Sequence, residues 1–139
     1  MISFQTIHVS MPSIDAERMR AWVQAVAASY GRRVGSIAYI FVDDEEILRV
    51  NRQFLQHDYY TDIITFDDSQ GAVICGDLFI SLDTVRSNAE GLGVPYEQEM
   101  YRVIIHGILH LCGVNDKGPG EREIMEAAEN RALVMFNEQ

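Results

Sequence analysis

The apolar residues of the chain recur at two spacings, and these spacings predict an ordered set of strands and helices. Runs rich in β-branched and aromatic residues predict strands at about 2–9, 34–42, 62–66 and 72–80. Apolar residues three and four positions apart predict helices at about 15–30, 43–55, 81–91, 95–112 and from 119 or 121 to 136. We therefore expect one α+β domain, residues 1–139, in which helices pack around a small mixed sheet of about four strands.

The order of the elements also predicts how they are connected. The first strand, helix and second strand read as one crossover unit, and such units join parallel strands. The polar segment 56–61 should be a loop, and the short turn at 67–71 favours an antiparallel hairpin between the last two strands. The helical spacing predicts that the core also receives the side chains of Ile47, Val50, Phe54, Ile124, Ala128 and Met135.

The helix expected near 95–112 differs from the others because apolar residues cover most of its circumference. Such a helix is usually buried in the middle of a protein. Its polar exceptions are Glu99, Arg102, His106 and His110, which fall within an arc of about 60°. Polar groups on a buried helix need partners, and a metal ion with bound water would supply them.

Composition and charge leave the binding partner open. The chain is 47% hydrophobic and 23% charged, as is typical of a globular domain, and its formal net charge is −10. This charge counts against binding of nucleic acid through the global field, although it does not exclude a local basic patch. Lys117 is the only lysine, so ten of the eleven basic residues are arginines, the side chain best suited to bidentate contact with phosphate.

Neither a membrane nor a disulfide framework is expected from the sequence. No apolar run approaches the roughly 18–20 residues of a membrane span, and the first residues lack the features of a signal peptide, so we expect the cytoplasm. Cys75 and Cys112 are far apart and form no CxxC pattern, so no disulfide is expected. Cys112 lies about 240° around the helix from His106, and we expect it to be a buried small apolar residue.

The segment 106–116 carries the candidate chemistry. His106 and His110 are four residues apart on a helix, so both imidazoles can reach one cation at about 2.0–2.1 Å. Gly113 can end the helix and turn the chain back, which would bring Asp116 toward the two rings as a third ligand. Three protein ligands leave a coordination position open for water, the arrangement of a catalytic zinc site. A helix cap is the alternative role for Asp116.

The residue after the first histidine limits the reaction class. Zinc peptidases of the HExxH type carry their general-base glutamate at that position, whereas this chain has Gly107. A peptidase would therefore need a general base displaced to another part of the fold. An iron(II) oxygenase shares a set of two histidines and one carboxylate, but its ligands usually lie on strands.

Three segments resemble one known family. Residues 106–116 (HGILHLCGVND) resemble the HGxLHLxGYDH signature of the YbeY proteins, which are single-strand-specific endoribonucleases of ribosomal RNA maturation. Residues 61–66 (TDIITF) resemble the family's TDVLSF strand, and 76–82 (GDLFISL) its GDIxISL segment. Asn51 stands where the family has the asparagine of its L-N helix. The resemblance, which spans nearly all of the chain from Val34, implies a small mixed sheet with helices and one zinc ion.

The chain departs from the family pattern at two positions. The third metal ligand is usually histidine, and Asp116 occupies that position here; aspartate also binds zinc. The family's catalytic arginine corresponds to Leu55, so Arg52 or Arg102 are the candidates to replace it. Lys117 is a further candidate for contact with a substrate phosphate.

These observations favour a metal-dependent endoribonuclease that holds one Zn²⁺ through His106, His110 and Asp116 and acts on single-stranded or ribosomal RNA, with the ribosome as a partner. Leu55 stands where the family has its catalytic arginine, and this departure favours the main alternative, a non-enzymatic ribosome-assembly factor that contains zinc. A metallopeptidase with a displaced general base is the other alternative.

Overall fold

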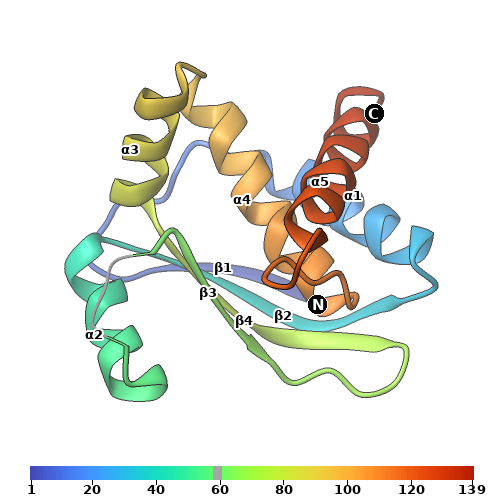
Figure 1. Ribbon diagram of the computed structural model, residues 1–139, viewed down its shortest axis with the longest axis horizontal. Helices are drawn as coiled ribbons and strands as arrows, with labels where there is room; N and C mark the ends of the chain where they lie inside the picture. Colours follow the sequence, from blue (N-terminus) through green and yellow to red (C-terminus); the bar gives the residue numbers. More distant parts are fainter. Residues whose placement is uncertain (58–60) are drawn as a thin grey trace.

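The computed structural model describes residues 1–57 and 61–139. These residues form four strands and five helices, in the order in which Figure 1 labels them. The elements are β1 (Ile2–Thr6), α1 (Ala16–Ser29), β2 (Arg33–Val42), α2 (Asp44–Leu55), β3 (Ile63–Asp67), β4 (Val73–Ser81), α3 (Leu82–Leu92), α4 (Tyr96–Leu111) and α5 (Glu121–Asn137). The loop expected at 56–61 includes residues 58–60, which lie outside the described residues.

The sheet is mixed, as the sequence predicts. Its strand order is β1-β2-β4-β3. β1 and β4 both run parallel to the central strand β2, whereas β3 pairs with β4 in the antiparallel direction. The expected crossover from β1 through α1 to β2 and the expected β3–β4 hairpin are both confirmed. β3 is consequently an edge strand that pairs with β4 on one side only.

The helices are distributed unequally between the two faces of the sheet (Figure 1). α1, α4 and α5 pack on one face, where their apolar side chains merge with those of β2 and β4 into the main core. α2 packs on the opposite face, where a smaller cluster joins Ile47 and Val50 to Ile40, Val42 and Ile64. α4 therefore lies between the sheet and α5, and the expectation of a buried helix is confirmed.

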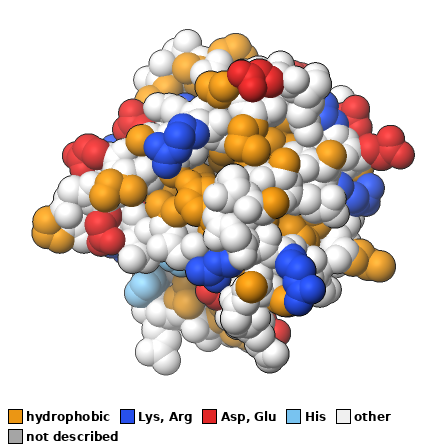
Figure 2. Space-filling model, turned by 90° about the vertical axis from the view of Figure 1, so that its right-hand side faces the viewer, with side chains coloured by type: hydrophobic (Ala, Val, Ile, Leu, Met, Phe, Trp, Pro, Cys, Tyr) orange, Lys and Arg blue, Asp and Glu red, His pale blue; other side chains and the backbone are white. Residues whose placement is uncertain are grey.

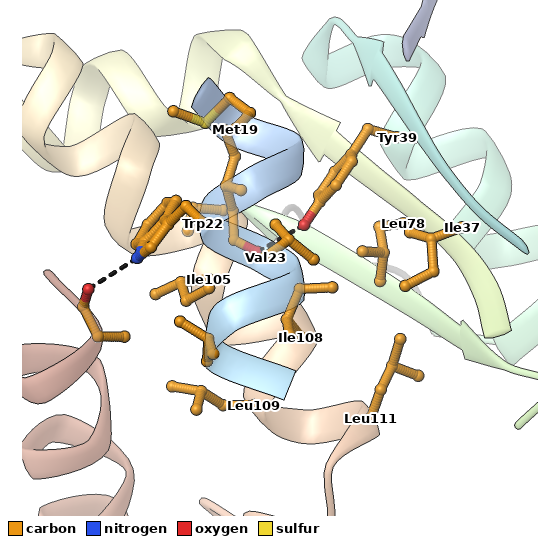
Figure 3. Close-up of a cluster of buried hydrophobic side chains, with 14 of the residues drawn as sticks. Met19, Trp22, Val23, Ile37, Tyr39, Leu78, Ile105, Ile108, Leu109 and Leu111 are labelled. Atoms are coloured by element: carbon orange, nitrogen blue, oxygen red, sulfur yellow. Dashed lines mark hydrogen bonds between the residues drawn. The ribbon is translucent and has the colours of Figure 1, made fainter. Parts of the chain in front are cut away.

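Two aromatic side chains connect the layers of the main core (Figure 3). Trp22 of α1 is fully buried, and its indole N–H donates a hydrogen bond to the Ala132 carbonyl of α5 over 2.7 Å. Tyr39 of β2 is also fully buried, and its hydroxyl donates to the Ile104 carbonyl of α4 over 3.0 Å. Each ring thus buries a large apolar surface while its polar atom remains satisfied.

The helix ends follow from local residues. Asp15, Asp43 and Ser81 are the N-caps of α1, α2 and α3, and each side chain accepts a hydrogen bond from a backbone N–H of the first turn. Gly113 follows α4 with a φ of +95°, a conformation that glycine adopts without strain. The predicted glycine stop after the histidine helix is therefore confirmed.

Three local expectations are wrong. β1 ends at Thr6 rather than at residue 9, because His8 takes a left-handed conformation with a φ of 62°. Phe54 is 57% exposed, because it lies on the last turn of α2, where its ring makes a T-shaped contact with that of Phe66. Ile124 is 59% exposed, because the buried stripe of α5 begins one residue later, at Met125.

Cys75 and Cys112 are free thiols, and Cys112 is buried as expected. None of the helices in the described residues is long and apolar enough to span a membrane. On the face shown in Figure 2, basic and acidic side chains are interspersed among hydrophobic ones, so this face presents no continuous field of one sign.

Candidate metal centre

The polar stripe of α4 faces a cavity of about 490 Å³ beside the edge strand β3. Five of the six residues proposed as metal ligands, catalytic residues or substrate contacts line this cavity, namely Arg102, His106, His110, Asp116 and Lys117. Leu55, at the position of the family arginine, lines it as well. Arg52 does not line it: its side chain borders a separate depression together with His8 and Glu45.

The chain reversal after α4 brings Asp116 to the histidines. The N–H groups of Gly113 and Val114 bond to the carbonyls of His110 and Leu109, and these bonds close the end of the helix. The loop then returns along α4, so that Asp116 Oδ2 lies 3.4 Å from His106 Nε2. The sequence expectation that Asp116 approaches the histidine helix is therefore met for His106.

Glu129 of α5 is a central residue of the site that our sequence reasoning missed. Its Oε2 lies 2.7 Å from His106 Nδ1, and its Oε1 accepts a hydrogen bond of 2.9 Å from Arg102 Nη1. The other terminal nitrogen of Arg102 donates to Asn130 Oδ1 over 2.8 Å. One signal could have revealed Glu129: it is a charged residue within the apolar stripe of α5, between Met125 and Ala132.

The contacts between Glu129 and His106 shift the pKa values of both side chains. Burial raises the pKa of Glu129, but the hydrogen bonds and charges of His106 and Arg102 outweigh burial and hold this pKa below its usual value. Burial lowers the pKa of His106, whereas Glu129, Asp116 and Asp62 raise it, and the net shift is upward. These carboxylates favour the protonated form of His106, and a metal ion at His106 Nε2 would compete with that proton.

The donor atoms are of the kinds that zinc prefers. Because Glu129 engages His106 Nδ1, the Nε2 atom remains available on the side of Asp116. His110 lines the same cavity with an exposed side chain. The described part of the chain contains no group of three His, Cys, Asp or Glu side chains already arranged to hold a metal ion. Zinc ligation by this set therefore requires side-chain rotation, which an exposed imidazole can undergo at small cost.

Two more carboxyl groups line the cavity, Asp62 before β3 and Glu99 on α4. Burial is the largest cause of a raised pKa at both groups. For Asp62, the charge of His106 partly opposes the increase, whereas for Glu99 the carboxylates of Asp62 and Glu129 add to it. The cavity thus combines three histidines, His57, His106 and His110, with a strongly acidic wall.

Gly107 lets α4 approach the sheet closely. A Cβ atom at this position would lie 2.9 Å from Ile63 Cδ1 and 3.1 Å from Leu78 Cδ2. These contacts are tighter than van der Waals packing allows, so even a methyl group requires its neighbours to move. Glycine therefore fits this helix–sheet contact without any movement of the Ile63 and Leu78 side-chain ends. The glutamate of an HExxH peptidase has no counterpart at this position of α4.

We expect Glu129→Gln to weaken zinc binding by about 10- to 100-fold, as is typical when the carboxylate partner of a metal-binding histidine is lost. The substitution keeps the shape of the side chain but removes the charge that holds His106 and Arg102. Competition with a chromogenic chelator would measure the affinity. Glu123→Gln, at an exposed position of α5, is the matched control, and equal affinities of the two variants would contradict the assignment.

The fold and the site define a small α+β protein with a histidine-bearing central helix. Residues 4–137 match the family model described as Endoribonuclease YbeY. The chain is 68% identical over 137 residues to Endoribonuclease YbeY of Phocaeicola vulgatus, covering 99% of both chains. It is 66% identical over 134 residues to Endoribonuclease YbeY of Bacteroides thetaiotaomicron, covering 96% of this chain and 98% of the relative. The chain belongs to the YbeY family, and the resemblance found in the sequence is confirmed.

A solved structure agrees with the fold. The solution structure of a Thermotoga maritima protein superposes with a TM-score of 0.67 at 24% sequence identity, and the match covers 99% of this chain and 93% of the other. The metal ligands and the catalytic side chains remain predictions.

Proposed function

We propose that this protein is a zinc-dependent endoribonuclease that cleaves single-stranded RNA during the maturation of ribosomal RNA in the cytoplasm. As a member of the YbeY endoribonuclease family, the chain is a hydrolase that acts on RNA. The zinc ion, the single-strand preference, the ribosomal substrate and partner, and the compartment are our proposals.

One observation carries the proposal of a metal site: two histidines and an aspartate from separate parts of the 106–116 segment line one cavity, and Glu129 holds one of these histidines. His106, His110 and Asp116 would hold the ion. When bound, zinc supplies a Lewis acid for the phosphodiester and lowers the pKa of water. The cavity lies beside an edge strand and is open to solvent, so an unpaired RNA strand has access to it.

The other side chains of the cavity have separable roles. Glu129 orients His106 and accepts from Arg102, so we assign to Arg102 the positioning of Glu129 rather than direct contact with substrate. Lys117 is exposed at the cavity and is the cation that we assign to a substrate phosphate. Leu55 offers no charge where the family has arginine, and Arg52 borders a different depression.

Cleavage by the highly purified protein tests this proposal. We expect a single-stranded fragment of ribosomal RNA precursor to be cleaved at least about tenfold faster than the same fragment annealed to its complement, because a duplex keeps its backbone away from a recessed site. Treatment with a chelator should stop the reaction, and addition of zinc should restore it.

The same assay separates the alternatives. Hydrolysis of an unstructured peptide without cleavage of RNA would support a metallopeptidase with a displaced base. If the pure protein cleaves neither substrate but its loss leaves ribosomal RNA precursors unprocessed in cells, it acts as an assembly factor. Either outcome would overturn the proposed nuclease mechanism.

A further inference from the structure

A second cavity, of about 530 Å³, lies on the other side of the α4 polar stripe, between α4, α5 and the end of α3. It shares a wall with the candidate metal centre, because Glu99, Arg102, His106, Asp116 and Glu129 line both cavities. A chain-like substrate bound at His106 can therefore extend from one cavity into the other. No step of the proposed reaction uses this second space.

The lining of the second cavity contains both apolar and polar side chains. Leu92, Val94 and Met125 supply the apolar part, and Leu92 is 66% exposed although it is a large hydrophobic residue. Gln98 and Arg122 add polar groups to the lining. A flat ligand with apolar faces and a polar edge fits such a lining, and nucleobases have this form.

Glu99 is the unusual residue at the junction of the two cavities. Residue Glu99 is only 6% exposed, and its carboxylate makes no hydrogen bond or ion pair with any residue in 1–57 and 61–139, although its oxygens still reach the cavities. Glu129, its neighbour in the same wall, has its carboxylate satisfied by His106 and Arg102. Burial and the carboxylates of Asp62 and Glu129 raise the pKa of Glu99, and the charge of Arg102 opposes this increase only in part. A ligand in the second cavity can therefore donate hydrogen bonds to the Glu99 oxygens.

We propose that the second cavity is a nucleobase subsite in which Glu99 accepts hydrogen bonds from the amino edge of a base, with guanine as the preferred base. The proposal rests on the proposed function, because it assumes that RNA is the substrate of the adjoining centre. Guanine presents two neighbouring N–H donors, which match the two oxygens of one carboxylate. Uracil presents mainly carbonyl oxygens, which a carboxylate repels.

Position along the helix separates this role from general-base catalysis. Glu99 lies seven residues before His106, about 10 Å along the axis of α4. At this distance, Glu99 can reach the base of a nucleotide next to the reacting phosphate. It cannot act as a general base on the 2′-hydroxyl, because that hydroxyl lies close to the phosphate. Phosphate itself is a poor ligand for the second cavity, because Glu99, Asp116, Glu126 and Glu129 outnumber its two arginines.

Binding of RNA analogues, measured with a chelator present so that no cleavage occurs, tests the proposal independently of catalysis. The probes are 2′-O-methyl hexauridine and its six variants with one guanosine each, and fluorescence anisotropy measures their affinity for the full-length protein. We expect at least one guanosine variant to bind about tenfold more tightly than hexauridine. Glu99→Gln, which keeps the side-chain shape, should remove this preference, while Glu97→Gln, at an exposed position of α4, should retain it.

A second variant tests the same subsite at a different residue, in case Glu99→Gln does not fold. Leu92→Ser changes an exposed residue of the apolar wall and should weaken binding of the preferred guanosine variant more than binding of hexauridine. Equal affinities of all seven oligonucleotides, no measurable binding, or a guanosine preference that survives Glu99→Gln would overturn the subsite. Cleavage of RNA without base preference would leave the proposed function standing, whereas guanosine preference without cleavage would leave only the subsite.

Discussion

His110→Ala is expected to weaken zinc binding by at least about 100-fold and to remove RNA cleavage in parallel. The loss should exceed that from Glu129→Gln, because a ligand is removed rather than the partner of a ligand. Metal content after dialysis and cleavage of a single-stranded precursor fragment would be measured on the same preparation. His110 suits this test because it lines the cavity but makes no side-chain hydrogen bond with the described residues.

The stability of the metal-free protein provides the internal check on that result. Because the His110 side chain is exposed, its removal should leave the unfolding temperature of the metal-free protein nearly unchanged. Zinc should raise the unfolding temperature of the parent protein and not that of the variant. His8→Asn, at a histidine outside the cavity, is the control. Unchanged cleavage by His110→Ala without bound metal would refute the zinc-dependent mechanism.

Trp22→Ala is expected to lower the free energy of unfolding by about 3–5 kcal/mol. The indole is fully buried, packs against Phe136 with ring centroids 4.7 Å apart, and donates to the Ala132 carbonyl. Ala132 lies on α5 less than one turn after Glu129, so the loss should also loosen the helix that holds His106. Chemical denaturation would measure the free energy, and zinc affinity would report the effect on the site.

Trp22→Phe separates packing from the hydrogen bond. It keeps an aromatic ring beside Phe136 but removes the indole N–H, so we expect a smaller loss than for Trp22→Ala. If the alanine variant lost less than about 1 kcal/mol, the connection between α1 and α5 would not be the main support of this core.

Hydrophobic periodicity predicted the order of all the elements because each helix and strand buries one regularly spaced set of residues. The buried residues Met19, Trp22, Val23 and Val26 of α1 lie at the spacing that the sequence predicted. Periodicity failed for Phe54 and Ile124, which have apolar side chains at positions that no neighbouring layer covers. The spacing places a residue on a face of its helix, but only the packing of the other elements decides how far along the helix that face is buried.

By itself, the sequence determined the local part of the candidate site. Four-residue spacing places His106 and His110 on one face of α4, and Gly113 ends the helix so that Asp116 can return. It also identified the YbeY family, because three separate segments kept their order and spacing.

Only the tertiary structure decided which distant side chains meet the histidines. The packing of α5 on α4 places Glu129 against His106 and Arg102, and the edge position of β3 opens the cavity beside them. The same packing separates Arg52 from the cavity and places Glu99 at the junction of two cavities. Helical spacing describes neighbours within about two turns, whereas these contacts depend on how the layers of the protein are stacked, which no local pattern records.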